Sequence, residues 1–466
     1  MKNIINGATR SILALFFAGQ VLSAASLPDT MLTNAWAFSL ARLRTTMTAL
    51  GNNTTQFPRR ATQTGGTWVT VAASDWTSGF YPGCLWLAYE KSGDTMFRYN
   101  AQRWTNALYA QRLTTTTHDV GFMIFTSYGN GYRLLGTSSY LPVIITAAQS
   151  LATRYRSLAG IIDSWSFAPY DTGWEAIIDN MMNLELMFWA SQNGAGVSFY
   201  DTALSHATKT MTNHFRTDSS TYHVVRYSRT TGAVISRETR QGYANSSCWA
   251  RGQSWAVHGF TMAYRFTGNA QFLVTARKAA DYFIYHLPAD RIPYWDYQAP
   301  GAGGTPDTTP RDASAAAIVA SGLLELSTFV GSADSVRYRD SAVSILRALC
   351  STKYRALTTQ TSILNHSTGS RPENTEVDVG LIYADYYFLQ ALLRYELYSR
   401  STAVLHWSAY LKKNAITLAP IPQPFDLLGR KIAIFSGPTP PGIFIIRVPE
   451  AQDQPSGQRT IISGIK

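Results

Sequence analysis

The chain has 466 residues, of which 45% are hydrophobic and 15% are charged, a balance that excludes a disordered chain and predicts one large globular domain with an appendage. Lysine and arginine exceed aspartate and glutamate by 40 − 29 = 11. No basic run carries a nucleic-acid motif, so nucleic acid is not an expected partner; the excess fits acidic polysaccharide fragments or simply a soluble basic surface.

The first 25 residues have the pattern of a secretory signal peptide. Lys2 and Arg10 supply positive charge, Ser11–Leu22 forms a short apolar core, and small residues precede an expected cleavage after Ala25. The apolar core is too short to span a membrane, and no other stretch predicts stable membrane insertion. We therefore expect export to the periplasm, the cell surface or the medium.

Helical patterns follow one another through residues 26–400, the expected barrel domain. Some are apolar nearly all round and others are amphipathic, which predicts an inner and an outer ring of paired helices. A small hairpin is expected from Tyr222–Tyr227 and Ala233–Arg237. The expected helices are 30–50, 83–92, 98–111, 121–135, 141–155, 175–192, 198–215, 252–266, 270–286, 312–328, 334–350 and 378–399.

Residues 401–466 change character, because repeated prolines break any helix there. This tail resembles the short β-type modules that sort or anchor secreted bacterial enzymes, and we expect a proline-rich linker followed by such a module. The expected strands are Lys431–Phe435, Gly442–Val448 and Arg459–Ile465.

The three cysteines, Cys84, Cys248 and Cys350, are an odd number without paired-ligand spacing. They are expected to be buried thiols, and a zinc site is not expected.

One apolar helix carries a carboxylate. Residues 176–190 (AIIDNMMNLELMFWA) are apolar on nearly all sides, yet they include Asp179, with Asn183 one turn away on the same face. Burial raises the pKa of a carboxyl group and makes it a plausible proton donor. The alternative is a polar core residue bonded to nearby backbone, and this segment alone leaves both interpretations open.

Four other segments bring polar or aromatic groups to the ends or inner faces of expected helices: 76–86, 118–122, 222–243 and 249–256. In the last of them Arg251 and Trp255 lie one turn apart, so a planar cation and a ring can face the same ligand. Each segment also has a structural interpretation, such as a loop of buried rings around Tyr81 or a helix cap at Asp119.

Taken in order, these segments resemble the unsaturated glucuronyl hydrolases of glycoside hydrolase family 88. The resemblance runs from about residue 35 to 398. It implies an all-α (α/α)6 barrel of six helical hairpins, with no metal and no organic cofactor. Its motifs are His118–Phe122, Ser164–Trp165, Ile177–Leu184, His223–Val225, Gln241–Tyr243, Trp249–Trp255 and Tyr383–Tyr387.

The resemblance also implies a reaction. The substrates would be oligosaccharides made by polysaccharide lyases, and the enzyme would hydrate the C4=C5 double bond of their non-reducing uronate. Asp179 would then be the general acid and base, and Asp119 a second carboxylate that holds sugar hydroxyls and tunes Asp179. The residues expected to line the uronate site are His223, Gln241, Arg251 and Trp255, with Trp165 stacking on the sugar.

The chain departs from the family pattern at two positions. Tyr81 stands where the family often has tryptophan, so we expect altered stacking at the sugar site. Ala384 stands where the family commonly has glycine, and there we expect only a change in packing. Residues that sort sulfated from unsulfated partners are expected around 365–367.

Two other functions fit parts of the pattern. The first is hydrolysis of unsaturated rhamnogalacturonyl disaccharides, but the motif at residues 249–255 (WARGQSW) argues against it. The second is an exported carbohydrate-binding protein without catalysis, against which the presence of both Asp119 and Asp179 speaks. The oligomeric state is left open.

Overall fold

The structure is a computed structural model that describes residues 26–62, 66–165, 173–305 and 307–413, together with strands 443–448 and 459–465. From residue 399 onward only the backbone is described. The expected signal peptide and the expected strand at 431–435 lie outside these residues. Within the described part, no helix is both long and apolar enough to cross a membrane.

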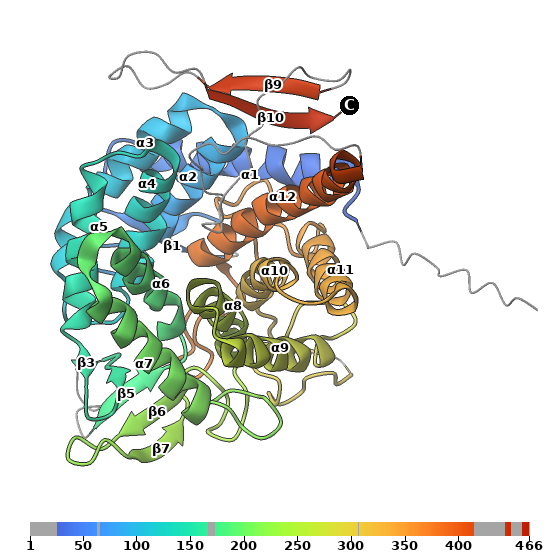
Figure 1. Cartoon of the computed structure of the whole chain (residues 1–466). Coiled ribbons are helices and arrows are strands. Elements are labelled where there is room, and N and C mark those ends of the chain that lie inside the picture. The colour runs from blue at the N-terminus through green and yellow to red at the C-terminus, as the bar shows by residue number, and fades with distance from the viewer. Residues whose placement is uncertain are drawn as a thin grey trace, which may run out of the picture.

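Helices dominate the structure (Figure 1). A π-helix, η2 (Gly121–Gly129), precedes α4. A 3-10 helix, η1 (Tyr109–Leu113), follows α3, and a short π-helix, η3 (Ser191–Ala195), follows α6. The α-helices are α1 (Asp29–Leu50), α2 (Phe80–Ser92), α3 (Thr95–Asn106), α4 (Asn130–Leu135), α5 (Tyr140–Ala152), α6 (Asn180–Ala190), α7 (Val197–Asn213), α8 (Ala250–Thr267), α9 (Ala270–Tyr285), α10 (Ala313–Leu326), α11 (Ser332–Leu349) and α12 (Ile382–Lys413).

The inner helices form a closed ring. Each of α2, η2, α6, α8, α10 and α12 packs against the next, and α12 returns to α2. Every residue of α10 is buried, whereas α9 and α11, which lie outside α8 and α10 in Figure 1, bury one face only. The predicted (α/α)6 barrel and its contrast between apolar and amphipathic helices are therefore confirmed.

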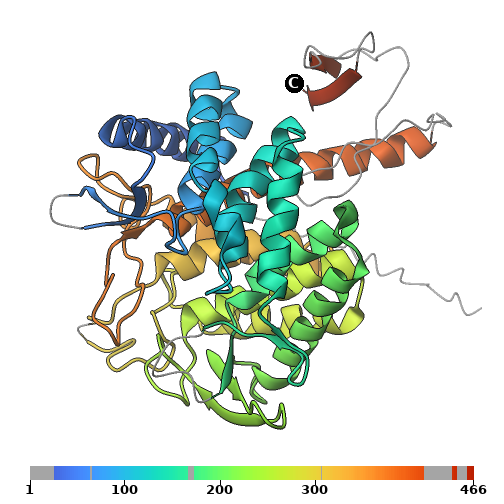
Figure 2. The same ribbon diagram turned by 90° about the vertical axis from the view of Figure 1, so that its left-hand side faces the viewer.

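Short antiparallel sheets join the helices. One sheet has the order β2-β1-β8, and another, green in the lower part of Figure 2, has the order β5-β6-β7. The expected hairpin at 222–237 is confirmed as β6 and β7, and the two described tail strands as β9 and β10. The strands are β1 (Phe57–Ala61), β2 (Trp68–Val71), β3 (Tyr155–Arg156), β4 (Ile161–Ile162), β5 (Trp174–Ile177), β6 (Val224–Tyr227), β7 (Val234–Glu238), β8 (Gly380–Leu381), β9 (Ile443–Val448) and β10 (Arg459–Ile465).

Two predicted helix boundaries were wrong. The helix expected at 175–192 begins only at Asn180, because Trp174–Ile177 is a mostly buried strand that pairs with β6. The helix expected at 378–399 begins at Ile382 and continues to Lys413, so the boundary expected at residue 400 falls inside α12. Local sequence could not show the late start of α6, since strand pairing depends on a partner far along the chain. The extension of α12 is permitted because no proline occurs between residue 400 and Pro420.

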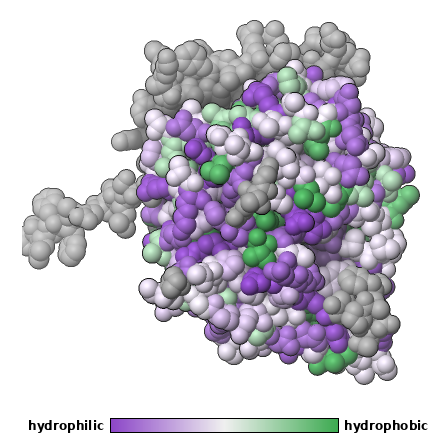
Figure 3. All heavy atoms as spheres, turned by 180° about the vertical axis from the view of Figure 1, so that it is seen from behind, coloured by the Kyte–Doolittle hydropathy of each residue, from purple (hydrophilic) through white to green (hydrophobic). Residues whose placement is uncertain are grey.

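The surface is mixed. On the face opposite to the view of Figure 1, apolar residues occur in small groups between polar ones (Figure 3). Cys84 and Cys248 are buried and Cys350 is half-buried, all three as free thiols.

A buried ion network joins four inner helices. Glu325 in α10 is fully buried and pairs with Arg265 of α8 at 2.7 Å and with Arg394 of α12 at 2.8 Å. Arg265 also contacts Glu185 of α6 at 2.7 Å. Burial alone would raise the pKa of Glu325, but Arg265 and Arg394 bring it down to about 2. The network thus fixes one side of the inner ring at the cost of keeping two guanidinium groups out of water.

We predict that Glu325→Gln lowers the free energy of unfolding by about 3–5 kcal/mol at pH 7, because Arg265 and Arg394 lose a buried partner. The folded pKa of Glu325 lies below its ordinary value of 4.5, so its contribution is present above pH 4.5 and is lost as the pH falls toward 2. Denaturant titrations should show that the difference in unfolding free energy between wild type and Glu325→Gln is smaller at pH 4 than at pH 7. Glu90→Gln is the matched control, because the Glu90–Arg133 pair is partly exposed and should contribute little. An equal loss in both variants would contradict the prediction.

Candidate active site

The β5–β6 ladder positions Asp179. Ile177 pairs with Val224, and the Ile178 N–H donates to the His223 carbonyl at 3.0 Å. The chain then turns into α6 at Asp179, whose φ of −57° and ψ of −29° are already helical. Asp179 Oδ1 lies 3.9 Å from His223 Nε2. Asp179 is therefore the residue at which a strand becomes a helix, and it does not lie within the longer helix that the sequence predicted.

The protonation of His223 follows from its hydrogen bonds. Its Nδ1 accepts the backbone N–H groups of Arg240, at 3.1 Å, and Gln241, at 3.3 Å. Burial, together with Arg251 and Arg240, lowers the pKa of His223 well below its usual value. The ring is thus neutral and carries its proton on Nε2, the atom that faces Asp179.

The two carboxylates differ in protonation. Burial would raise the pKa of Asp119, but His118, Thr117 and Arg154 lower it below the ordinary value; the Thr117 hydroxyl donates to its Oδ2 at 2.5 Å. Burial raises the pKa of Asp179 to about 6 against the opposing effects of Arg251 and His118, with Asp119 adding to the rise. Two nearby acids whose pKa values are driven apart can serve as a proton donor and a fixed anion.

Arg251 is held by the protein itself. It is 1% exposed, pairs with Asp312 at 3.0 Å, and donates to the carbonyls of Thr368 at 2.5 Å and Gly369 at 2.6 Å. Gln241 Nε2 donates to the same Gly369 carbonyl at 3.0 Å. Two residues expected to line the uronate site therefore also fasten the loop after residue 366 onto the barrel.

Buried polar atoms without a hydrogen-bond partner occur at Asp179 and on the segments near it. In the described part of the chain they include Asp179 Oδ1 itself, and the surrounding set is mostly donors. Native proteins satisfy nearly all buried polar groups, so such a concentration indicates a place for a polar ligand. The surrounding atoms are His223 Nε2, His118 Nδ1, Trp255 Nε1 and the Tyr383 hydroxyl.

Aromatic rings connect these groups. Trp255 lies 5.4 Å from Phe122, Phe122 lies 5.5 Å from Trp76, and Trp76 lies 5.1 Å from Tyr383, measured between ring centroids. Trp165 approaches His223 edge-on at 6.5 Å. The structure thus places Trp165 beside His223, which faces Asp179, and places Trp255 in one ring cluster with Phe122, Trp76 and Tyr383.

Tyr81 does not join this cluster. Its buried ring packs edge-on against Trp104 of the outer helix α3, with 4.9 Å between the centroids. Adjacent helix residues project about 100° apart, so Phe80 faces the inner ring while Tyr81 faces outward. This packing contradicts the expectation that Tyr81 binds the sugar, whereas Trp76, five residues earlier in the same aromatic loop, packs against Phe122 and Tyr383.

Several residues of the cluster were not singled out from the sequence. His118 and Tyr383 lay within recognised motifs, and Trp76 opened the aromatic loop. Asp312 carried no signal beyond preceding an alanine-rich helix, where its side chain caps Ser314 and Ala315.

Among the described residues, no three His, Cys, Asp or Glu side chains converge to hold a metal ion.

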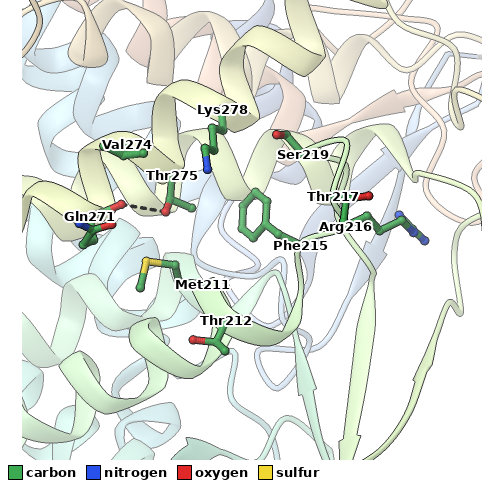
Figure 4. Close-up of a pocket in the computed structure, with 10 residues that line it drawn as sticks. All are labelled: Met211, Thr212, Phe215, Arg216, Thr217, Ser219, Gln271, Val274, Thr275 and Lys278. Atoms are coloured by element: carbon green, nitrogen blue, oxygen red, sulfur yellow. Dashed lines mark hydrogen bonds between the residues drawn. The ribbon is translucent and has the colours of Figure 1, made fainter.

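A separate hollow of about 370 Å³ lies between the end of α7 and α9 (Figure 4). Its lining shares no residue with the cluster around Asp179. The residues that line it are Met211, Thr212, Phe215, Arg216, Thr217, Ser219, Gln271, Val274, Thr275 and Lys278.

Comparison with known proteins identifies the family. The family model for Glycosyl Hydrolase Family 88 matches residues 52–412. The chain belongs to this family. It is therefore a glycoside hydrolase, as the motif pattern predicted.

Relatives of this family 88 protein have described activities. It is 42% identical over 329 residues to an unsaturated glucuronyl hydrolase of Formosa agariphila, covering 70% of this chain and 80% of the relative. It is 33% identical to an unsaturated chondroitin disaccharide hydrolase of Streptococcus pyogenes serotype M1, covering 73% of this chain and 85% of the relative.

Solved structures agree. A crystal structure of an unsaturated glucuronyl hydrolase specific for heparin has a TM-score of 0.76 and 40% identity, covering 80% of this chain and 99% of that one. The unsaturated glucuronyl hydrolase of Bacillus sp. GL1 has a TM-score of 0.73 and 30% identity, covering 78% of this chain and 96% of that one.

We predict that Asp179→Asn stabilises the protein at high pH. The folded pKa of Asp179, about 6, lies above its ordinary value of 3.8, so ionisation costs stability as the pH rises from about 4 to 6, and the full cost persists above 6. The cost is about 3 kcal/mol. Thermal unfolding at pH 8 should show a higher melting temperature for the variant, and the gain should vanish near pH 4.

Asp119→Asn provides the contrast. Because the folded pKa of Asp119 is lowered, its charge supports the fold above its ordinary pKa, and that support is lost as the pH falls. This variant should therefore melt below wild type at pH 8. The same sign for both variants would show that the two carboxylates are not held in different protonation states.

Proposed function

We propose that the protein removes the unsaturated uronate from the non-reducing end of lyase-generated oligosaccharides by hydrating its C4=C5 double bond. One observation carries the proposal: a protonatable Asp179 beside an anionic Asp119, within a buried group of unpaired donors. Addition of water to a vinyl ether needs a proton donor for carbon and a set of donors that orient an acidic sugar. The activities of the relatives support the same reaction.

In this mechanism Asp179 acts twice. Its proton passes to C4 while a water oxygen bonds to C5, and the resulting Asp179 carboxylate takes the proton that the water gives up. The product is a hemiketal at C5. Its ring C5–O bond opens, and the hemiacetal left at C1 releases the glycosidic partner as an alcohol. One water is consumed, and Asp179 ends with its proton restored.

The other residues bind and orient the sugar. Arg251 contributes positive charge for the uronate carboxylate, although its hydrogen bonds to Asp312 and the loop carbonyls keep it in place. The Nε2–H of His223 and the Nε1–H of Trp255 are donors for sugar oxygens. Trp165 supplies a ring for stacking on the sugar. Preorganised charge and positioning would provide most of the rate.

We further propose glycosaminoglycan fragments as the substrate class, acted on after export. Relatives named for chondroitin and for heparin products support the class, and the basic excess of the chain is suited to acidic substrates. The pattern of residues 1–25 supports export.

The reaction predicts a loss of the ultraviolet absorbance of the conjugated double bond. We expect wild type to remove this absorbance from at least one of the unsaturated chondroitin, hyaluronan or heparin disaccharides, and Asp179→Asn to be slower by about 10²–10⁴-fold. Absorbance that persists with all these substrates and with unsaturated gellan and xanthan fragments would rule out the proposed function. A melting temperature of the variant at or above that of wild type would show that its loss of activity does not reflect unfolding.

We predict that kcat/KM falls above pH about 6, because the reaction needs the protonated form of Asp179 and its pKa is about 6. Initial rates between pH 4.5 and 8.5 measure this limb. A rate that stays level up to pH 8 would mean that another group donates the proton.

A further inference from the structure

Asn183 ties together the two segments that carry the carboxylates. It follows Asp179 by one helical turn on the same face and is fully buried. Its Oδ1 accepts the Phe122 N–H at 2.8 Å. Phe122 comes three residues after Asp119, and the next N–H, of Met123, donates to the Asp119 carbonyl at 3.0 Å. One amide oxygen on α6 therefore holds the start of η2.

The contact between these segments is very close. A Cβ atom at Gly121 would lie 2.7 Å from both the Cα and the Oδ1 of Asn183. Any side chain at position 121 would therefore push η2 away from α6. Gly121 lies two residues after Asp119, so its close approach to Asn183 restricts the position of Asp119.

If the Asn183 side chain served only to fill space, its amide group would lower the stability of the fold. Asn183 Nδ2 is buried without a hydrogen-bond partner, and leaving such a donor unsatisfied costs about 1–3 kcal/mol. An apolar residue of the same size would avoid that cost. The residue type is thus explained by its acceptor, which Phe122 uses, and not by the filling of space.

We propose that Asn183 is a positioning residue that fixes Asp119 relative to Asp179 through its hydrogen bond to the Phe122 N–H. The inference rests on the proposed function, in which Asp179 donates the proton and Asp119 is the anion beside it.

The groups that face Asp179 come from three other segments. His118 and Asp119 precede η2, His223 precedes β6, and Arg251 lies on α8. Arg251 is fixed by Asp312, and His223 is fixed by two backbone N–H groups. The segment with His118 and Asp119 is held before Asp119 by the His118 N–H, which donates to the Ser164 carbonyl at 3.3 Å, and after Asp119 by Asn183.

The first test compares Asn183→Leu with Asn183→Asp. Leucine removes the acceptor, so we expect kcat to fall about 10-fold or more while KM changes less than threefold. Aspartate keeps an acceptor for Phe122, so at pH 5 it should retain more of kcat than leucine does. Its added negative charge, one turn from Asp179, should also move the basic limb of kcat/KM to higher pH. Gly121→Ala should reproduce the loss of kcat by forcing η2 outward.

Asn180→Leu is the matched control. Asn180 is also fully buried on α6, but its amide contacts the Ile162 carbonyl and His206, away from the carboxylates. We expect it to lower the melting temperature without moving the pH limb. Asn183→Leu should leave the melting temperature nearly unchanged, since it removes one unpaired donor and creates another.

A measurement without substrate separates this inference from the proposed function. At pH 8, Asp119→Asn and Asp179→Asn are combined in a double-mutant cycle of unfolding free energies, in wild type and in the Asn183→Leu background. The coupling between the carboxylates should shrink at least twofold in that background. An unchanged coupling, a kcat unaffected by Asn183→Leu, or an equal loss in Asn180→Leu would each overturn the inference. Wild type that turns over no unsaturated disaccharide would overturn the proposed function and leave the cycle to decide the role of Asn183.

Discussion

Burial of the Asp179 carboxyl group is the constraint on which the site depends. The inner helices close into a ring of apolar residues, and Asp179 enters that ring at the point where β5 becomes α6. Out of water, the ionised form is penalised, and the proton stays on the group up to about pH 6. The same carboxyl on an exposed helix would be ionised under those conditions and could not act as an acid. The fold therefore makes the chemistry available before any substrate binds.

The cations near the site are fixed by interactions that leave little freedom. Arg251 is bound by Asp312 and by two loop carbonyls, and Arg59 holds the same loop from another side through Glu376 at 2.6 Å. His366, Asn374, Glu376 and Asp378 in this loop all have positive φ. Such backbone conformations are costly for residues other than glycine and persist only when surrounding contacts impose them. The loop is thus held in one conformation by its contacts. Two of the residues that hold it, Arg251 and Gln241, were expected from the sequence only to bind the sugar.

Much of the fold was predictable because it depends on periodic patterns. Apolar helices at 175–192 and 378–399 indicated the inner ring, and the turn at 231–232 indicated the β6–β7 hairpin. The start of α6 was not predictable, since Trp174–Ile177 is helical by local pattern and a strand only because β6 lies beside it. The prediction that Tyr81 lies at the sugar site was wrong for a related reason. Adjacent residues of one helix face different layers of the barrel, and packing decides which of them faces inward.

By itself the sequence determined the family and the barrel, and it predicted Asp179 and Asp119 as the two carboxylates of the site, because ordered motifs and hydrophobic periodicity are properties of the chain. Only the tertiary structure decided which groups drive the two carboxyl pKa values apart, which nitrogen of His223 faces Asp179, and that Asp312 and Asn183 hold the site in place. These outcomes depend on burial and on hydrogen bonds between residues that are up to 61 positions apart. Such distances close only when the chain is folded, so no local pattern can reveal them.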